Sequence, residues 1–297
     1  MSAAAEAIRR GIVTGKRAER SIRALVFHAL LLLCLLIALL TLLTLLVDVV
    51  RDGAGRVNGT LFNNLDSRFA ARAGLKPALV GSLWIMALVA AISFPLGVGA
   101  AVYLEEFAPK NRLTSFIELN VLNLAAVPSI IYGLLGLAAF VRFAHMGRSI
   151  LAAAMTLVLL SLPIIIVAAR EAIRAVPPSI REGSLAVGAT EWQTVWHQTL
   201  PAALPGVFTG MILGLSRAIG EAAPLITLGA LTYVSFVPSG PGDRFTALPI
   251  MIFNWIGRPA GKGFDQLAAA GILVLLGVLL AMNGVAIALR NRYERRW

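Results

Sequence analysis

One arginine and one glutamate interrupt an apolar run in the last third of the sequence. Arg217 and Glu221 are four residues apart, so a helix would place them one turn apart on the same face. A charge at bilayer depth costs at least about 2.5–3.5 kcal/mol on insertion scales, and such residues are usually functional. The guanidinium is a planar fork of donors that suits an oxyanion, and Glu221 would hold it in place. The pair predicts an anion site, with a structural ion pair inside a helix bundle as the alternative.

A charged segment that contains several helix-breaking residues precedes this run, from residue 170 to residue 201. Two adjacent prolines interrupt any helix that continues from the preceding run, and proline fits the first turn of a new one. We expect a short helix over residues 180–187 with Ser179 as its N-cap. Gly188 would end that helix in the left-handed conformation, and Thr190 would cap a second helix. The segment is therefore predicted to expose two short helices on one membrane face.

The elements that must position these residues are membrane helices. Hydrophobic residues make up 58% of the 297 residues and charged residues 14%, whereas a soluble domain has about 25% charged residues. Six apolar runs are each long enough to cross a hydrocarbon core of about 30 Å as a helix. They cover residues 25–47, 77–104, 119–141, 149–169, 205–233 and 266–289. The sequence predicts an all-α membrane protein with six transmembrane helices and a short helix at 246–256 in an external loop.

The formal charge of +11 is typical of basic residues that anchor membrane helices, and no nucleic-acid-binding module is recognisable. Lys and Arg are more frequent in the segments that would share a side with the two termini, which predicts cytoplasmic termini. Cys34 is the single cysteine and the three histidines are scattered, so we predict no metal site and no catalytic residue. Glu105 and Glu106 are expected in a solvated turn; the alternative is an acid–base pair of an intramembrane enzyme.

The spacing within the charged segment resembles the EAA loop of type-1 ABC importer permeases. In that pattern three residues separate Glu-Ala-Ala from a glycine, and nine residues separate this glycine from Ile-x-Leu-Pro. The matching positions here are Glu182, Gly183, Ser184, Gly188, Gln198, Leu200 and Pro201. The sequence departs from the pattern at Gly183, Ser184 and Gln198. The resemblance implies that the loop forms a coupling helix, which docks into a groove of a separate nucleotide-binding subunit.

Four further segments resemble phosphate permeases of the PstA and PstC type. They are S-R-A-I-G-E-A-A-P-L from Ser216, F-P-L-G-V-G-A-A-V-Y-L-E-E-F-A-P from Phe94, V-P-S-I-I-Y-G-L-L-G-L from Val127 and F-T-A-L-P-I-M-I-F-N-W-I-G-R-P from Phe245. The resemblance covers the chain from about residue 77 to residue 290. The A-A-P-L after Glu221 and the N-W-I-G-R-P segment favour the PstA type.

This resemblance implies a MetI-like core of five helices preceded by one N-terminal helix. Residues 1–66 would hold a cytoplasmic tail, the first transmembrane helix and the start of an external loop. Residues 67–291 would form the permease domain, and residues 292–297 a second cytoplasmic tail. Arg217 and Glu221 would line the substrate pathway.

The function implied is that of a permease subunit that moves inorganic phosphate across the bacterial inner membrane. The sequence has no P-loop, so a partner ATPase would bind ATP and Mg²⁺, and the chain itself would need no cofactor. The implied partners are a second permease of the PstC type, two ATPase subunits of the PstB type and a periplasmic binding protein of the PstS type. The alternatives are a permease for sulfate, molybdate or phosphonate, and a secondary anion transporter driven by an ion gradient.

Overall fold

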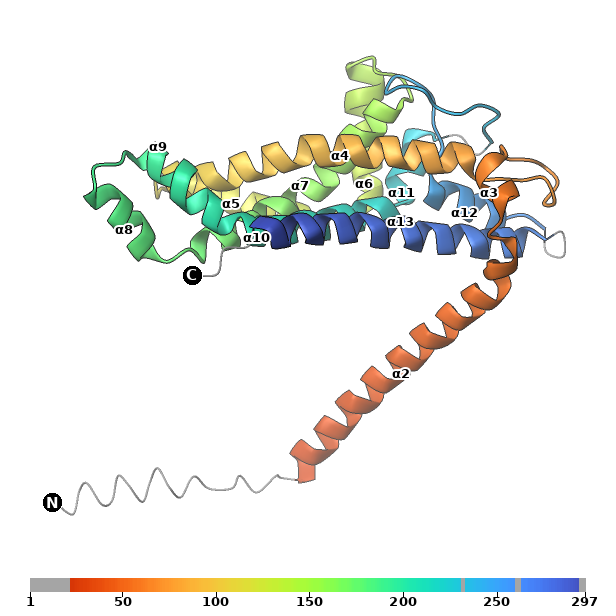
Figure 1. Cartoon of the computed structure of the whole chain (residues 1–297), viewed down its shortest axis with the longest axis horizontal. Helices are drawn as coiled ribbons and strands as arrows, with labels where there is room; N and C mark the ends of the chain where they lie inside the picture. Colours follow the sequence, from red (N-terminus) through yellow and green to blue (C-terminus); the bar gives the residue numbers. More distant parts are fainter. Residues whose placement is uncertain (1–21, 231–232, 260–262, 294–297) are drawn as a thin grey trace. The chain divides into compact units, whose positions relative to one another are not determined.

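The computed structural model describes residues 22–230, 233–259 and 263–293, and the regular elements within these ranges are all helices (Figure 1). Contacts divide the chain into two compact units, residues 1–49 and 50–297. Most of α2, Ile22–Gly53, belongs to the first unit. Leucine, isoleucine and valine dominate this helix of 32 residues, so it is long and apolar enough to cross a membrane. It contains the first expected span.

Four long helices of the second unit run side by side (Figure 1). They are α4, Lys76–Val102, α7, Ile150–Arg174, α10, Leu200–Gly220, and α13, Phe264–Tyr293. α7 packs against α4 and α10, and α10 also packs against α13. Small residues allow the close contact: a Cβ atom added to Gly210 of α10 would lie 2.4 Å from the Cβ of Ala168 on α7. The second unit is therefore a bundle with α7 and α10 at its centre.

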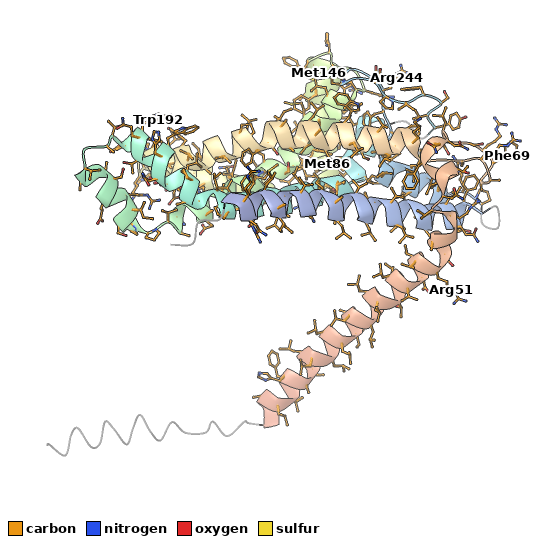
Figure 2. All side chains as sticks on the ribbon, viewed as in Figure 1. Arg51, Phe69, Met86, Met146, Trp192 and Arg244 are labelled. Atoms are coloured by element: carbon orange, nitrogen blue, oxygen red, sulfur yellow. The ribbon has the colours of Figure 1, made fainter. Side chains whose placement is uncertain are left out.

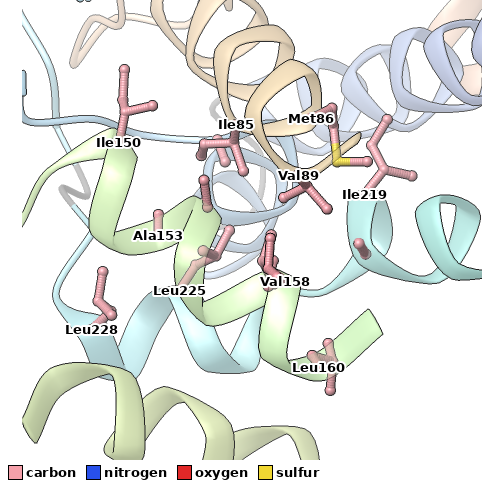
Figure 3. Packing of buried hydrophobic residues seen from close by; sticks show 14 of the residues in the cluster. Ile85, Met86, Val89, Ile150, Ala153, Val158, Leu160, Ile219, Leu225 and Leu228 are labelled. Atoms are coloured by element: carbon pink, nitrogen blue, oxygen red, sulfur yellow. The ribbon is translucent and has the colours of Figure 1, made fainter. Parts of the chain in front are cut away.

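Apolar side chains fill the space between α4, α7, α10 and the short helix α11, Ala223–Leu228 (Figure 3). The core includes Ile85, Met86 and Val89 of α4, Ile150, Ala153, Val158 and Leu160 of α7, Ile219 of α10, and Leu225 and Leu228 of α11. Each of these side chains is at most 7% exposed, so close van der Waals packing between the membrane helices stabilises this region.

The third expected span, 119–141, is wrong as a single helix. The chain forms α5, Arg112–Ala125, and then α6, Ser129–Gly136, which continues as the π-helical η3, Leu137–Phe143. The two parts are bent by 104° at Pro128, where the ring disfavours a helical conformation of the preceding residue. Within the described ranges, five single helices are long and apolar enough to cross a membrane, and the bent pair makes six if it counts as one span.

The fifth expected span, 205–233, is wrong at both ends. The long helix begins at Glu191, because α9, Glu191–Thr194, and the π-helical η4, Val195–Thr199, run without a break into α10. It ends at Gly220, although the apolar composition continues. A helix that continued through Pro224 would bring its ring against the carbonyl of Gly220 and would lack one amide donor. The break therefore lies where the proline of α11 requires it.

A buried carboxylate organises the bundle end that carries α3, Gly59–Asn63, and α12, Leu248–Ile256. The side chain of Asp66 is 1% exposed and accepts hydrogen bonds from Arg258 at 3.0 Å and from the Trp255 indole at 3.2 Å. The Arg258 guanidinium also donates to the carbonyl of Ser67 at 2.8 Å. These bonds hold the loop after α3 against the end of α12. The range of α12, Leu248–Ile256, confirms the short helix expected at 246–256.

Replacing Arg258 with methionine should destabilise the purified protein by about 2 kcal/mol, because the buried Asp66 carboxylate loses a charge-assisted hydrogen bond. The measurement is the midpoint of thermal unfolding in detergent. Arg68→Met is the matched control, since Arg68 is a nearby exposed arginine without an ion-pair partner in the described part of the chain. Equal midpoints for the two variants would contradict the role given to Arg258.

A short loop caps the start of α7. The amides of Ile150 and Leu151 donate to the carbonyls of Asp243 and Pro241, at 3.0 and 2.8 Å. The Asp243 carboxylate accepts hydrogen bonds from the amide and hydroxyl of Ser239 and from the amide of Gly240, and these bonds hold its pKa below the ordinary value. Because the pKa of Asp243 is lowered in the folded state, its hydrogen bonds stabilise the folded protein at neutral pH. This stabilisation is lost as the pH falls through the folded-state pKa of Asp243.

Candidate functional site

Arg217 and Glu221 lie at the end of α10. Arg217 is in the last turn of the helix, and Glu221 follows Gly220 with an extended backbone, φ −80° and ψ 112°. The Arg217 Nε donates to the Glu221 carboxylate at 3.4 Å, which confirms that the spacing of four residues brings the two side chains together. The two residues therefore form an ion pair across the break between α10 and α11.

The bond between Ser216 and Asn283 places this ion pair within the apolar part of the bundle. The Ser216 hydroxyl donates to the Asn283 side-chain oxygen of α13 at 2.8 Å. Asn283 is six residues, or about 9 Å of helix, inside the apolar run that ends at Leu289. Tyr132 of α6 is 5% exposed and within electrostatic range of Arg217. The charges thus lie at the end of α10 but beside the interior of α13, away from both ends of that helix.

Arg217 lies on the open face of α10. The residues that the second unit leaves exposed on this helix follow helical spacing, at Thr209, Leu213, Arg217 and Gly220. The Arg217 side chain is 39% exposed and the Glu221 side chain 20% exposed. Charged side chains in membrane helices face a bundle interior or a water-filled cavity rather than lipid. This face is therefore suited to form one wall of a polar path that another protein surface completes.

The charged segment expected to bind an ATPase forms α8, Pro178–Ala186, followed by α9. Gly188 ends α8 with a φ of +91°, and Thr190 caps α9 in a capping box with Gln193, as expected. Ser179 is not the N-cap, because Pro177 precedes the helix and the ring of Pro178 already preorganises its first turn.

The structure separates the EAA-like residues into two groups. Glu182 and Gly183 are exposed on α8, and the Ser184 hydroxyl lies 2.9 Å from the hydroxyl of Thr194. Leu200 and Pro201 lie apart from these residues, inside the long helix that begins at Glu191. The contact between Ser184 and Thr194 therefore joins α8 to the continuous helix that begins at Glu191 and includes α10.

Replacing Gly188 with alanine should strain the turn between α8 and α9 by about 1–2 kcal/mol, because an L-residue disfavours a φ of +91°. The expected result is faster hydrogen exchange of the α8 amides. Gly183→Ala is the control: Gly183 lies within α8, and a Cβ atom there would meet no atom within 4 Å. Unchanged exchange in Gly188→Ala would contradict the strain.

An ion-pair network, which the sequence analysis did not find, joins α8 to two other elements. The Arg181 guanidinium of α8 lies 2.7 Å from the carboxylate of Glu106. It also donates to the carbonyls of Ile173 and Val176, at 2.9 and 3.0 Å, where α7 ends. The Glu106 side chain is 12% exposed, so the expected solvated turn is wrong. Arg181 thus fastens α8 to α7 and to the π-helical η2, Tyr103–Phe107.

The ion-pair network also joins α7 to η2 and α5. The Glu105 carboxylate, 17% exposed, pairs with Arg174 at 2.9 Å and with Arg170 at 3.3 Å. Arg170 reaches across to Glu118 of α5 at 2.7 Å. Arg170 and Arg174 belong to α7, which continues five residues beyond the expected end of the fourth span at residue 169. In the sequence, the paired residues are distinguished only by their opposite charges, and they are more than fifty positions apart. Charge alone does not predict which of them form pairs.

Three aromatic rings lie beside the network. Trp192 stacks on Trp196 with ring centroids 5.8 Å apart, and Phe107 lies 6.0 Å from Trp192. Trp192 and Trp196 are 60% and 55% exposed, and Figure 2 shows Trp192 at the bundle end that carries α8. Their indole rings suit a boundary between apolar and aqueous surroundings. Within the described ranges, no three His, Cys, Asp or Glu side chains are placed to hold a metal ion.

The sequence is similar to those of transport proteins. The family described as binding-protein-dependent transport system inner membrane component matches residues 93–296. The phosphate transport system permease protein PstA 1 of Mycobacterium tuberculosis is 32% identical over 232 residues, which are 78% of this chain and 75% of that protein. The probable ABC transporter permease protein YqgI of Bacillus subtilis is 35% identical over 184 residues. This match spans 62% of this chain and 63% of YqgI.

Solved structures share the arrangement of helices. An inward-facing structure of the methionine ABC transporter MetNI matches 74% of this chain and 97% of its own, with a TM-score of 0.59 and 20% identity. A bacterial ABC transporter that imports the polysaccharide alginate matches 92% and 97%, with a TM-score of 0.61 and 14% identity. These identities support the fold alone. The chain is thus a multi-pass membrane protein with the fold of an ABC importer permease, and it belongs to the family of binding-protein-dependent transport system inner membrane components.

Proposed function

We propose that this chain is the permease subunit of an ATP-driven importer of inorganic phosphate. The observation that carries the proposal is the Arg217–Glu221 pair at membrane depth on an open helix face. A relative with 32% identity is named a phosphate transport permease, and this supports phosphate over sulfate, molybdate or phosphonate. The chain contributes one wall of the path and no ATPase activity.

Phosphate would enter between the two charged side chains. The Arg217 fork donates to two phosphate oxygens, and Glu221 keeps the fork oriented until the anion arrives. The Glu221 carboxylate then accepts a hydrogen bond from the O–H of hydrogen phosphate. Sulfate has no such proton at neutral pH, so it would face an unpaired carboxylate. This difference gives the site a physical basis for selectivity.

A second permease, of the PstC type, would complete the path at the open face of α10, because one chain would supply only one wall. Two ATPase subunits of the PstB type would bind ATP and Mg²⁺ and grip α8, and Glu182, Gly183, Ser184, Gly188, Leu200 and Pro201 would transmit the movement. A PstS-type protein would deliver phosphate at the end formed by α3 and α12. This assignment places α8 and both termini in the cytoplasm, within a bacterial inner membrane, and keeps the permease domain at residues 67–291.

The test is uptake of labelled phosphate by liposomes that contain the chain with its permease and ATPase partners, with the binding protein outside. Uptake should require ATP inside the liposomes, and excess sulfate, molybdate or phosphonate should not compete. Uptake driven by an ion gradient without ATP would instead identify a secondary transporter. Equal competition by sulfate would overturn the choice of phosphate.

A further inference from the structure

A cavity of about 680 Å³ opens at the bundle end that carries α8. It lies between η2, α5 and the last turns of α7. The Glu105, Glu118, Arg170 and Arg174 side chains of the ion-pair network form its floor. The proposed path for phosphate is lined by other residues, so the transport function does not account for this cavity.

The mouth of the cavity has two cations without a counterion. Lys110 and Arg112 line it, both are exposed, and neither side chain has an ion-pair partner within the described ranges. Arg170 and Arg174 are already paired with carboxylates of the floor. The cavity therefore has four basic and two acidic side chains, and its excess positive charge is at the mouth.

An apolar wall continues inward from this mouth. Arg112, Phe116 and Leu119 all line the cavity and are separated by four and three residues on α5, so they share one face of the helix. Phe116 and Leu119 lie about 6 and 10 Å beyond Arg112 along the helix axis, and they are 62% and 59% exposed. Leu104 lines the same cavity. This face of α5 therefore places two apolar side chains after a cation, beside the charged residues of the floor.

We propose that this cavity binds an anionic phospholipid. The headgroup phosphate lies between Lys110 and Arg112, and an acyl chain follows Phe116 and Leu119. Basic pockets between membrane helices on the cytoplasmic side are suited to such headgroups. The apolar wall favours a phospholipid over free phosphate, which would leave that wall in contact with water. The inference uses the proposed orientation, with α8 in the cytoplasm, but does not depend on the transported substrate.

The assembled transporter, in nanodiscs of phosphatidylcholine containing phosphatidylglycerol, provides the test. Native mass spectrometry counts the phosphatidylglycerol molecules that remain bound after release. A Lys110→Gln/Arg112→Gln double variant should retain this lipid about thirtyfold more weakly, since each basic group near a headgroup contributes about 1 kcal/mol. The matched control is Arg290→Gln/Arg292→Gln, which removes the same charge from the last turn of α13 and should retain the lipid normally.

Each outcome decides the proposal. Unchanged retention in the Lys110→Gln/Arg112→Gln variant would overturn it. Displacement of the lipid by millimolar inorganic phosphate would show that free phosphate is the occupant. Loss of the ATPase subunit with normal lipid retention would show that the surface is a protein contact. An Arg217→Ala variant should keep its lipid, so a failure of the transport function is distinguishable from a failure at this cavity.

Discussion

Replacing Arg217 with alanine is expected to abolish phosphate uptake while the complex with its partners remains assembled. The substitution removes the donors proposed to hold the anion, and each hydrogen bond to a charged group is worth about 1.5–3 kcal/mol. Loss of two such bonds predicts a fall in uptake of at least about a hundredfold. The Arg217 side chain contacts Glu221 across the helix break and is 39% exposed, so its removal leaves the core of α4, α7 and α10 intact.

Three measurements separate this role from a structural one. Uptake reports the site, co-purification reports assembly, and the unfolding midpoint reports stability. Arg217→Lys keeps the charge but loses the planar fork, so its uptake should lie between those of the native protein and Arg217→Ala. Glu221→Gln should weaken discrimination between phosphate and sulfate. Uptake at the native rate by Arg217→Ala would show that the Arg217–Glu221 pair is a structural contact and does not bind phosphate.

Replacing Arg181 with methionine is expected to uncouple ATP hydrolysis from transport. The variant deprives Glu106, 12% exposed, of its partner and removes donors from the carbonyls at the end of α7. Each charge-assisted bond contributes about 1.5–3 kcal/mol, so α8 would lose its attachment to α7 and η2 and keep its contact with α9. We expect the ATPase to remain bound and active, while its stimulation by the loaded binding protein and the uptake of phosphate both fall at least tenfold.

A second substitution tests whether the bond itself matters. In Arg181→Met/Glu106→Leu both partners become apolar, so no buried charge remains unpaired and part of the stability should return. Arg174→Met is the control on the same network; its side chain is 54% exposed and should matter less. If Arg181→Met keeps native stimulation by the binding protein, α8 transmits force without this bond.

Composition was sufficient to predict the helical class but not where helices break. The uncharged runs correctly placed α2, α4, α7 and α13, because burial in lipid requires apolar residues along the whole span. Pro128 and Pro224 lie at real breaks, whereas Pro95 and Pro163 lie inside continuous helices. Local sequence does not distinguish these cases, since the outcome depends on whether neighbouring helices accommodate the bend.

The local chemistry of the site was predictable, and its long-range partners were not. Gly188 and Thr190 took the expected conformations, since a left-handed turn and a helix cap depend on neighbouring residues. The spacing of Arg217 and Glu221 likewise predicted their contact. Arg181 and Glu106 are 75 residues apart, and only the packing of α8 against α7 and η2 brings them together.

The break after Gly220 gives the charged pair a second property. Arg217 is fixed to the long helix, whereas Glu221 occupies the joint that leads to α11. The distance between the two side chains therefore depends on the angle between α10 and α11. A rotation that moved Glu221 away would free the Arg217 guanidinium, and the reverse rotation would restore the ion pair. In the proposed mechanism, a movement of the long helix that begins at Glu191 would therefore change both the angle of this joint and the affinity for phosphate.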